Sequence, residues 1–138
     1  MTENIDTAIV THLSADATIV SLATGGVWLE TAPGHVASPF VIVSRRFSED
    51  ENVVGLGEST ETVEYLVKAV DQSTSVTTVN LLAKAIRTRM KTTFEATGYD
   101  ILAVIRTGTA GPFAELVDDQ ITWQHRGQLY EVVAVISV

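Results

Sequence analysis

The sequence predicts an α+β fold, a mostly antiparallel sheet packed on one long helix and preceded by short N-terminal helices. Three observations predict it. The first is a segment from Ser75 to Phe94 whose apolar residues recur every three or four positions, the spacing of one helix face. The second is the set of strand-like runs on both sides of this segment. The third is the order of the pieces, which is helices, strands, one helix, then strands, and which favours helices on one face of a sheet.

The long helix has a buried and an exposed face, and its ends are marked. Ser73 or Ser75 can accept a hydrogen bond from the first turn, and Gly98 can supply a left-handed residue at the end. Lys84, Arg87 and Lys91 lie on the face opposite the apolar one. The apolar face consists of Val79, Leu82, Ala83, Ile86, Met90 and Phe94.

Length and composition restrict both the organisation and the function. The chain has 138 residues, which fits a single domain over 1–138. With 17 acidic and 9 basic residues the net charge is −8, which opposes tight DNA binding because such binding depends on phosphate neutralisation by Lys and Arg. The absence of cysteine excludes disulfides, zinc ribbons and thiol catalysis. Without an apolar leader or membrane span, the chain is expected to be made in the cytoplasm.

The first 30 residues predict two short helices and a strand. Asn4 is placed to cap a helix that continues to Leu13, and Ser14 or Asp16 to cap a second helix over residues 17–23. Gly25 and Gly26 end that helix, and residues 27–30 form a short strand.

The middle of the chain predicts two strands joined by a long connection. Residues 40–47 form a strand that starts apolar on both faces, and residues 61–71 form the next one. Between them, an acidic run and two glycines predict an irregular loop over residues 48–58. This loop is longer than the 2–5 residues or so that a plain hairpin needs.

The C-terminal third predicts a strand, a break and a hairpin. Residues 99–107 are strand-like, and the segment from Gly108 to Pro112 interrupts them. Residues 120–125 and 129–138 alternate or are β-branched, so Arg126-Gly127 between them predicts a hairpin turn.

No pattern in the sequence predicts catalysis, a cofactor or a metal site. His12, His35 and His125 lack the spacing of metal ligands, and His12 on an apolar helix face is expected to be buried and hydrogen-bonded. No nucleophile elbow or dinucleotide loop occurs. The carboxylates at 49–51 and 118–119 match no calcium loop, and a solvated acidic surface is the simpler interpretation. We therefore expect a protein that is not an enzyme.

Two surfaces are candidates for contacts between subunits or with a partner. In the 48–58 loop, Val53, Val54 and Leu56 follow the acidic residues Glu49, Asp50 and Glu51; the apolar three either meet a partner or fold back as a small cluster. On the long helix, Lys84, Arg87 and Lys91 are either a solvated face or a surface complementary to the acidic run in a head-to-tail contact.

The order of these pieces resembles the tail terminator proteins of long-tailed bacteriophages, also called tail completion or tail-to-head joining proteins. The resemblance covers nearly the whole chain, but the segment from Gly108 to Asp119 has no counterpart in it. It rests on the first helix (Ile5 to Leu13), the restart at Ser14 to Ala17, Val27-Trp28, Pro39 to Val43, the long loop, Val63 to Ala69, the long helix, Trp123 and Leu129-Tyr130.

The resemblance implies a structural virion protein at the head-proximal end of the tail. Copies of it would form a homohexameric ring that caps the tail tube, stops its growth and joins the tail to the head connector. The implied partners are other copies, the tail tube protein and the connector protein, while DNA passes through without specific binding. Alternatives are another neck or tail component, such as a head-completion or tail tube protein, or a small ligand-binding or hydrolytic domain.

Overall fold

The computed structural model describes residues 3–53, 58–117 and 121–136. In chain order the elements are α1 (Glu3–Ser14), α2 (Ala17–Leu22), β1 (Val27–Leu29), β2 (Phe40–Val53), β3 (Glu58–Gln72), α3 (Thr77–Arg89), β4 (Tyr99–Val117) and β5 (Ile121–Ile136).

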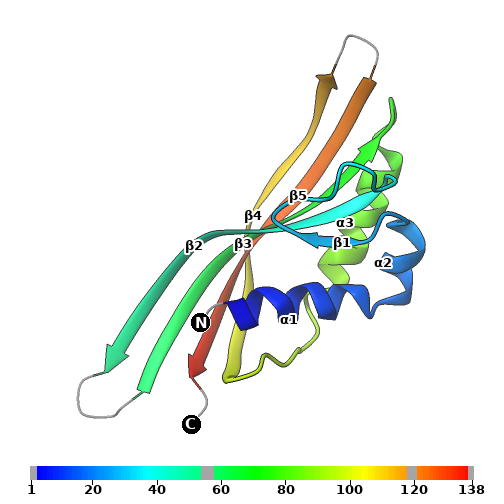
Figure 1. Ribbon diagram of the computed structural model, residues 1–138. Helices are drawn as coiled ribbons and strands as arrows, with labels where there is room; N and C mark the ends of the chain where they lie inside the picture. The colour runs from blue at the N-terminus through cyan, green and yellow to red at the C-terminus, as the bar shows by residue number, and fades with distance from the viewer. Residues whose placement is uncertain (1–2, 54–57, 118–120, 137–138) are drawn as a thin grey trace.

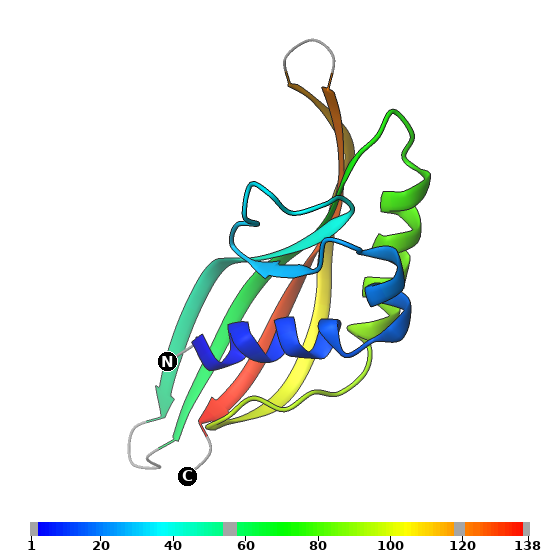
Figure 2. The same cartoon turned by 45° about the vertical axis from the view of Figure 1, so that its right-hand side comes forward.

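The five strands form one sheet in the order β1-β2-β3-β5-β4. All neighbouring pairs are antiparallel except β1 and β2, which run parallel. Figures 1 and 2 show the three helices on one side of this twisted sheet. The predicted α+β class with a mostly antiparallel sheet is therefore confirmed.

The hydrophobic core lies between the helices and the sheet. In β3 alternate residues from Val63 to Ala69 are buried, as expected for a strand with one face toward the core. Each large aliphatic side chain buried in this way contributes about 1.5–3 kcal/mol of transfer free energy. The helices contribute to this core Ile5, Ile9 and Leu13 from α1, Ile19 from α2, and Val79, Leu82 and Ile86 from α3.

The prediction of one long helix is wrong, because α3 has 13 residues and α1 has 12. Helix α3 ends at Arg89, whose carbonyl oxygen accepts a hydrogen bond from the Thr92 hydroxyl at 2.6 Å and lies 3.0 Å from Nε2 of His12. These side chains satisfy a terminal carbonyl that a longer helix would have bonded internally. Gly98, expected to end the helix, instead occupies the turn before β4 with a φ of 83°.

The predicted caps have different outcomes. Asp16 caps α2, since its Oδ1 accepts a hydrogen bond from the Ile19 backbone N–H at 3.0 Å. Asn4 lies inside α1 and instead donates from Nδ2 to the Thr97 carbonyl at 2.8 Å. The cap position of α3 is Val76; just before it, the Ser75 hydroxyl accepts from the Thr77 backbone N–H at 3.2 Å.

The expected irregular loop over residues 48–58 is mostly strand. Residues up to Val53 continue β2, and β3 starts at Glu58. The register shifts between Arg45 and Phe47, and there β2 bends sharply (Figure 1). A β-bulge bends a strand in this way while the pairing with β3 continues beyond it.

The expected break at Gly108 to Pro112 and the expected turn at Arg126-Gly127 are also wrong. Strand β4 passes through the first segment with register shifts, and Gly111 there has a φ of 82°. Strand β5 continues through Gly127, where an added Cβ would lie 2.9 Å from the Val67 carbonyl oxygen of β3. These glycines therefore permit a bulge and a close approach of two strands, and the β4–β5 pairing replaces the predicted hairpin.

Candidate interaction surfaces

Two extensions of the sheet project beyond the helices (Figure 1). The first, the β2–β3 arm, comprises residues 47–53 and 58–64 and lies at the lower left. The second, the β4–β5 arm, comprises residues 108–117 and 121–128 and lies at the top. Because β1 pairs only with residues 41–43 of β2, the β2 side of the first arm is an open sheet edge in the part of the chain that the structure describes. Exposed edges and projecting hairpins are surfaces that proteins use for contacts.

The β2–β3 arm is strongly acidic. Residues 47–64 contain six carboxylates and no Lys or Arg. Glu49, Asp50 and Glu51 pair with Thr62, Glu61 and Thr60, so two acidic residues lie directly opposite each other at Asp50 and Glu61. Glu61 is only 5% exposed, and its Oε2 has no hydrogen-bond partner among the described residues. Like charges in opposite positions destabilise a strand pair, so the concentration of negative charge in this arm lowers the stability of the β2–β3 pairing.

The apolar residues predicted for this region are only partly described. Val53 is the last described residue of β2 and pairs with Glu58. Val54 and Leu56 lie outside the described residues.

A basic surface lies on α3 and on the two strands beside it. Lys84, Arg87 and Lys91 are exposed, as predicted from the helical pattern. The strands add Arg106 from β4 and Arg126 from β5. Lys84, Arg87 and Arg126 line a cavity of about 270 Å³, and Arg87, Lys91 and Arg106 line one of about 100 Å³. Sequence reasoning missed Arg106 and Arg126 because only the pairing of β4 with β5 brings them to α3.

The β2–β3 arm is held to α1 at its root. Tyr65 of β3 is fully buried, and its hydroxyl donates a hydrogen bond to Oδ1 of Asp6 in α1. Nη1 of Arg45, next to the bulge in β2, lies 3.7 Å from Oδ2 of the same carboxylate. Burial and the bond to Asp6 raise the pKa of Tyr65. The carboxylate of Asp6 thus joins one helix and two strands where the arm begins.

The sequence profile of the family of tail completion protein gp17 matches residues 7–113, which is most of the chain. The chain belongs to this family. It is accordingly a structural protein of a phage tail, located in the virion. A chain from the structure described as "Virion of native gene transfer agent (GTA) particle" has a similar fold, with a TM-score of 0.71 and 14% identity over 94% of each chain. A search of curated proteins finds no match.

The β4–β5 arm of this tail completion protein carries exposed apolar side chains. Phe113 stacks on His125, with ring centroids 4.8 Å apart and planes 7° apart, and Leu116 is 62% exposed. Nε2 of His125 lies 3.5 Å from Oε2 of Glu115, yet neither ring nitrogen has a hydrogen-bond partner among the described residues. Burial, and to a lesser extent the Lys68 ammonium, lower the pKa of His125.

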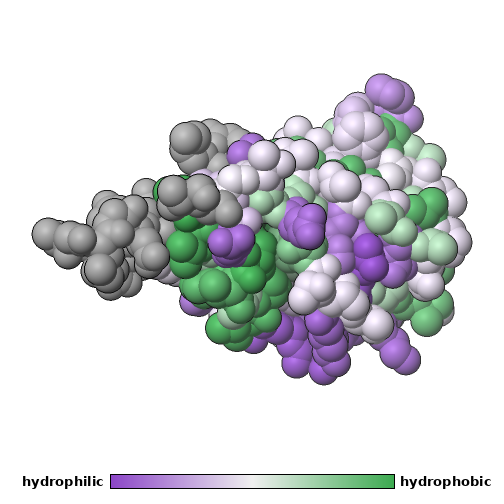
Figure 3. Space-filling model, turned by 90° about the horizontal axis from the view of Figure 1, so that it is seen from below, coloured by the Kyte–Doolittle hydropathy of each residue, from purple (hydrophilic) through white to green (hydrophobic). Residues whose placement is uncertain are grey.

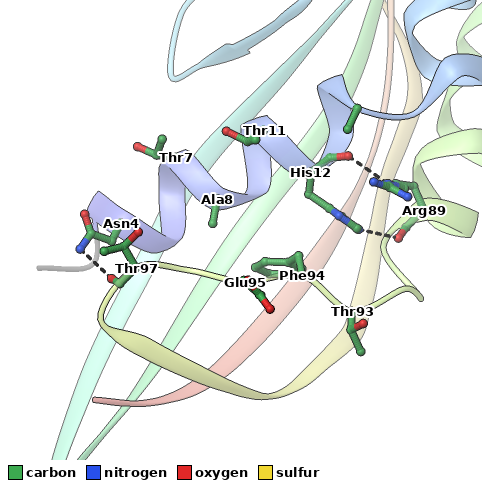
Figure 4. A pocket seen from close by; sticks show the side chains of 11 residues that line it. Asn4, Thr7, Ala8, Thr11, His12, Arg89, Thr93, Phe94, Glu95 and Thr97 are labelled. Atoms are coloured by element: carbon green, nitrogen blue, oxygen red, sulfur yellow. Dashed lines mark hydrogen bonds between the residues drawn. The ribbon is translucent and has the colours of Figure 1, made fainter. Parts of the chain in front are cut away.

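An open cavity of about 770 Å³ lies between α1 and the segment that joins α3 to β4 (Figure 4). The side chains around it hold these elements together. Nε of Arg89 donates to the His12 carbonyl at 2.9 Å, and His12 in turn contacts the Arg89 carbonyl. His12 is buried, as predicted, and burial lowers its pKa. The polar groups of His12 and Arg89 in this cavity are therefore engaged in joining α1 to α3.

A hydrophobic patch lies at the lower end of the sheet (Figure 3). At this end Tyr99 of β4 pairs with Ile136 of β5. Ile136 is 39% exposed and Leu102, in the bulge after Ile101, is 62% exposed. Apolar side chains gathered at one end of a sheet are typical of a protein contact.

The three histidines lie on different elements of the fold. His12 is in α1, His35 is exposed in the connection between β1 and β2, and His125 is in β5. Within residues 3–53, 58–117 and 121–136, no cluster of three or more potential ligands could hold a metal ion. In the same ranges, no helix is both long and apolar enough to cross a membrane.

Proposed function

We propose that this tail completion protein assembles into a closed ring, which we expect to be a hexamer. The ring would cap the tail tube, stop its growth and join the tail to the head connector. The observation that carries the proposal is the separation of opposite charges. The acidic β2–β3 arm and the basic surface on α3 lie on opposite sides of the subunit in both views (Figures 1 and 2). Two different surfaces that meet head to tail generate a ring when the rotation closes.

The remaining surfaces provide contacts for other tail components. The apolar part of the β4–β5 arm and the patch around Leu102 and Ile136 are suited to the tail tube and connector proteins. Within the ring, the subunit contact would use Glu49, Asp50, Glu51, Val53, Val54 and Leu56. The net charge of −8 per copy suits a lumen through which DNA slides without binding.

Two measurements test the proposal. Native mass spectrometry and electron microscopy of the purified protein should give closed rings of one subunit number. Added to the tail tube protein of the same phage during polymerisation, the rings should cap the tubes and shorten them. Long tubes of this protein alone would indicate a tube protein instead, and a monomer or dimer at low and moderate salt would contradict the ring.

A further inference from the structure

The basic surface has the properties of an unoccupied contact. From 72 to 94 the chain has four Lys or Arg residues and no carboxylate. Among the described residues, no carboxylate lies within ion-pair distance of Lys84, Arg87, Lys91 or Arg106. Arg126 is held in place by a hydrogen bond of 2.7 Å from its Nη1 to Oδ1 of Asn80. Clustered positive charges repel one another, so an acidic partner would reduce this repulsion.

The acidic arm is the segment of this chain that fits the basic surface. Glu49 and Glu51 are two residues apart in β2, about 7 Å along the strand. Arg87 and Lys91 are four residues apart in α3, about 6 Å along the helix. If β2 of one copy lay along α3 of another, its carboxylates would thus recur at nearly the same interval as the positive charges of the helix. Two β2 edges paired with each other would instead place acidic runs together, which like-charge repulsion opposes.

We propose that the β2–β3 arm of one copy docks on the basic surface of the next copy, with Arg87 at the centre of the contact and Arg106 and Arg126 on its flank. This inference rests on the proposed ring and names the contact that builds it. Duplex DNA is the less suitable occupant, because the rest of a chain with a net charge of −8 repels phosphate.

Charge reversal tests the docking, with ring formation as the readout. The variant Arg87→Glu should raise the protein concentration needed for rings by roughly tenfold or more, because it places like charges in the contact. The matched control is Lys68→Glu, which makes the same change of charge at a residue of β3 outside both the arm and the basic surface and should form rings normally. Circular dichroism and melting temperature check that both variants fold.

A charge swap separates pairing from a general charge effect. Reversal of Glu49, Asp50 and Glu51 to Lys should abolish rings, as should reversal of Lys84, Arg87 and Lys91 to Glu. A chain that carries both triple reversals keeps its net charge and should recover rings. If the doubly reversed chain forms no rings although it is folded, the proposed pairing is wrong.

Cross-linking distinguishes failure of the pairing from failure of the ring. Equal amounts of ¹⁴N- and ¹⁵N-labelled protein are mixed and treated with a carbodiimide, which joins a carboxylate to an amine in direct contact. The expected product links Lys84 or Lys91 of one copy to Glu49, Asp50 or Glu51 of another. Rings without this product contradict the docking alone, and the product without rings contradicts the ring alone. Binding of labelled duplex DNA is measured for wild type and for Arg87→Glu. If wild type binds the DNA, and Arg87→Glu loses this binding but still forms rings, the basic surface belongs to DNA instead.

Discussion

Replacement of Tyr65 by Phe tests whether the Asp6 junction stabilises the fold. The change removes one hydroxyl, which donates to a buried carboxylate. A hydrogen bond to a charged group contributes about 1.5–3 kcal/mol, and its loss leaves the carboxylate oxygen without this donor. Tyr130 is also buried, but its hydroxyl donates to a neutral amide, Oε1 of Gln128, at 2.9 Å. Tyr130→Phe is therefore the matched control, with an expected cost of about 0.5–1.5 kcal/mol.

The assay is urea and thermal unfolding followed by circular dichroism. For a chain of this length, 1 kcal/mol corresponds to about 3–4 °C in melting temperature, so Tyr65→Phe should lose about 5–10 °C and Tyr130→Phe about 2–5 °C. Protein concentrations must be low enough for single copies, since assembly raises the apparent stability. A double-mutant cycle with Asp6→Asn should give a coupling of about 1 kcal/mol or more. If Tyr65→Phe costs no more than Tyr130→Phe, the Asp6 carboxylate is not the source of this stability.

Three further variants test other parts of the structure. Burial lowers the pKa of His12 in the folded state, so the stability that neutral His12 contributes is complete above pH 6.5 and declines as the pH falls below it. The melting temperature of His12→Asn should therefore depend less on pH between 5 and 7.5 than the melting temperature of wild type. An unchanged slope would contradict this. His125→Phe should raise the free energy of unfolding by about 1 kcal/mol, because it removes two buried nitrogens that lack hydrogen-bond partners among the described residues. A lower free energy of unfolding in urea would refute this. A triple variant with Ser at Val53, Val54 and Leu56 should keep a nearly unchanged melting temperature but form fewer rings in native mass spectrometry. A large loss of melting temperature would show that these residues belong to the core.

The parts of the fold that sequence predicts well are those fixed by local periodicity. The buried face of α3, with Val79, Leu82 and Ile86, follows from helical spacing, and the alternation of β3 follows from strand spacing. The hydrogen-bonded burial of His12 follows from its place on an apolar helix face. The two periodicities depend only on residues within a few positions of one another, whereas the hydrogen-bond partner of His12, the Arg89 carbonyl, lies 77 positions away and could not be predicted.

The parts that sequence reasoning missed depend on pairing across long distances. The acidic run at 49–51 has low strand propensity, yet pairing with Thr60 to Thr62 keeps it in β2. Gly111 and Gly127 read locally as breaks, although they permit a bulge and a close contact inside two long strands. The basic surface was half predicted for the same reason, because its helix residues share a face in sequence and its strand residues do not.

The charge distribution also determines which kind of assembly is favourable. A two-fold contact in which each surface meets its own copy would place two acidic arms or two basic surfaces against each other, and both cost free energy through like-charge repulsion. A two-fold contact that exchanges the arms would need the arm and the basic surface to face the partner together, although they lie on opposite sides of the subunit (Figures 1 and 2). A head-to-tail contact pairs opposite charges, but it has no inherent end, so closure depends on the rotation between successive copies. On the proposed docking, that rotation is fixed by the direction of the β2–β3 arm relative to α3. The bulge between Arg45 and Phe47 bends the arm, and the bonds of Asp6 fix its root to α1. The junction that stabilises the subunit would thereby also determine how many copies close a ring.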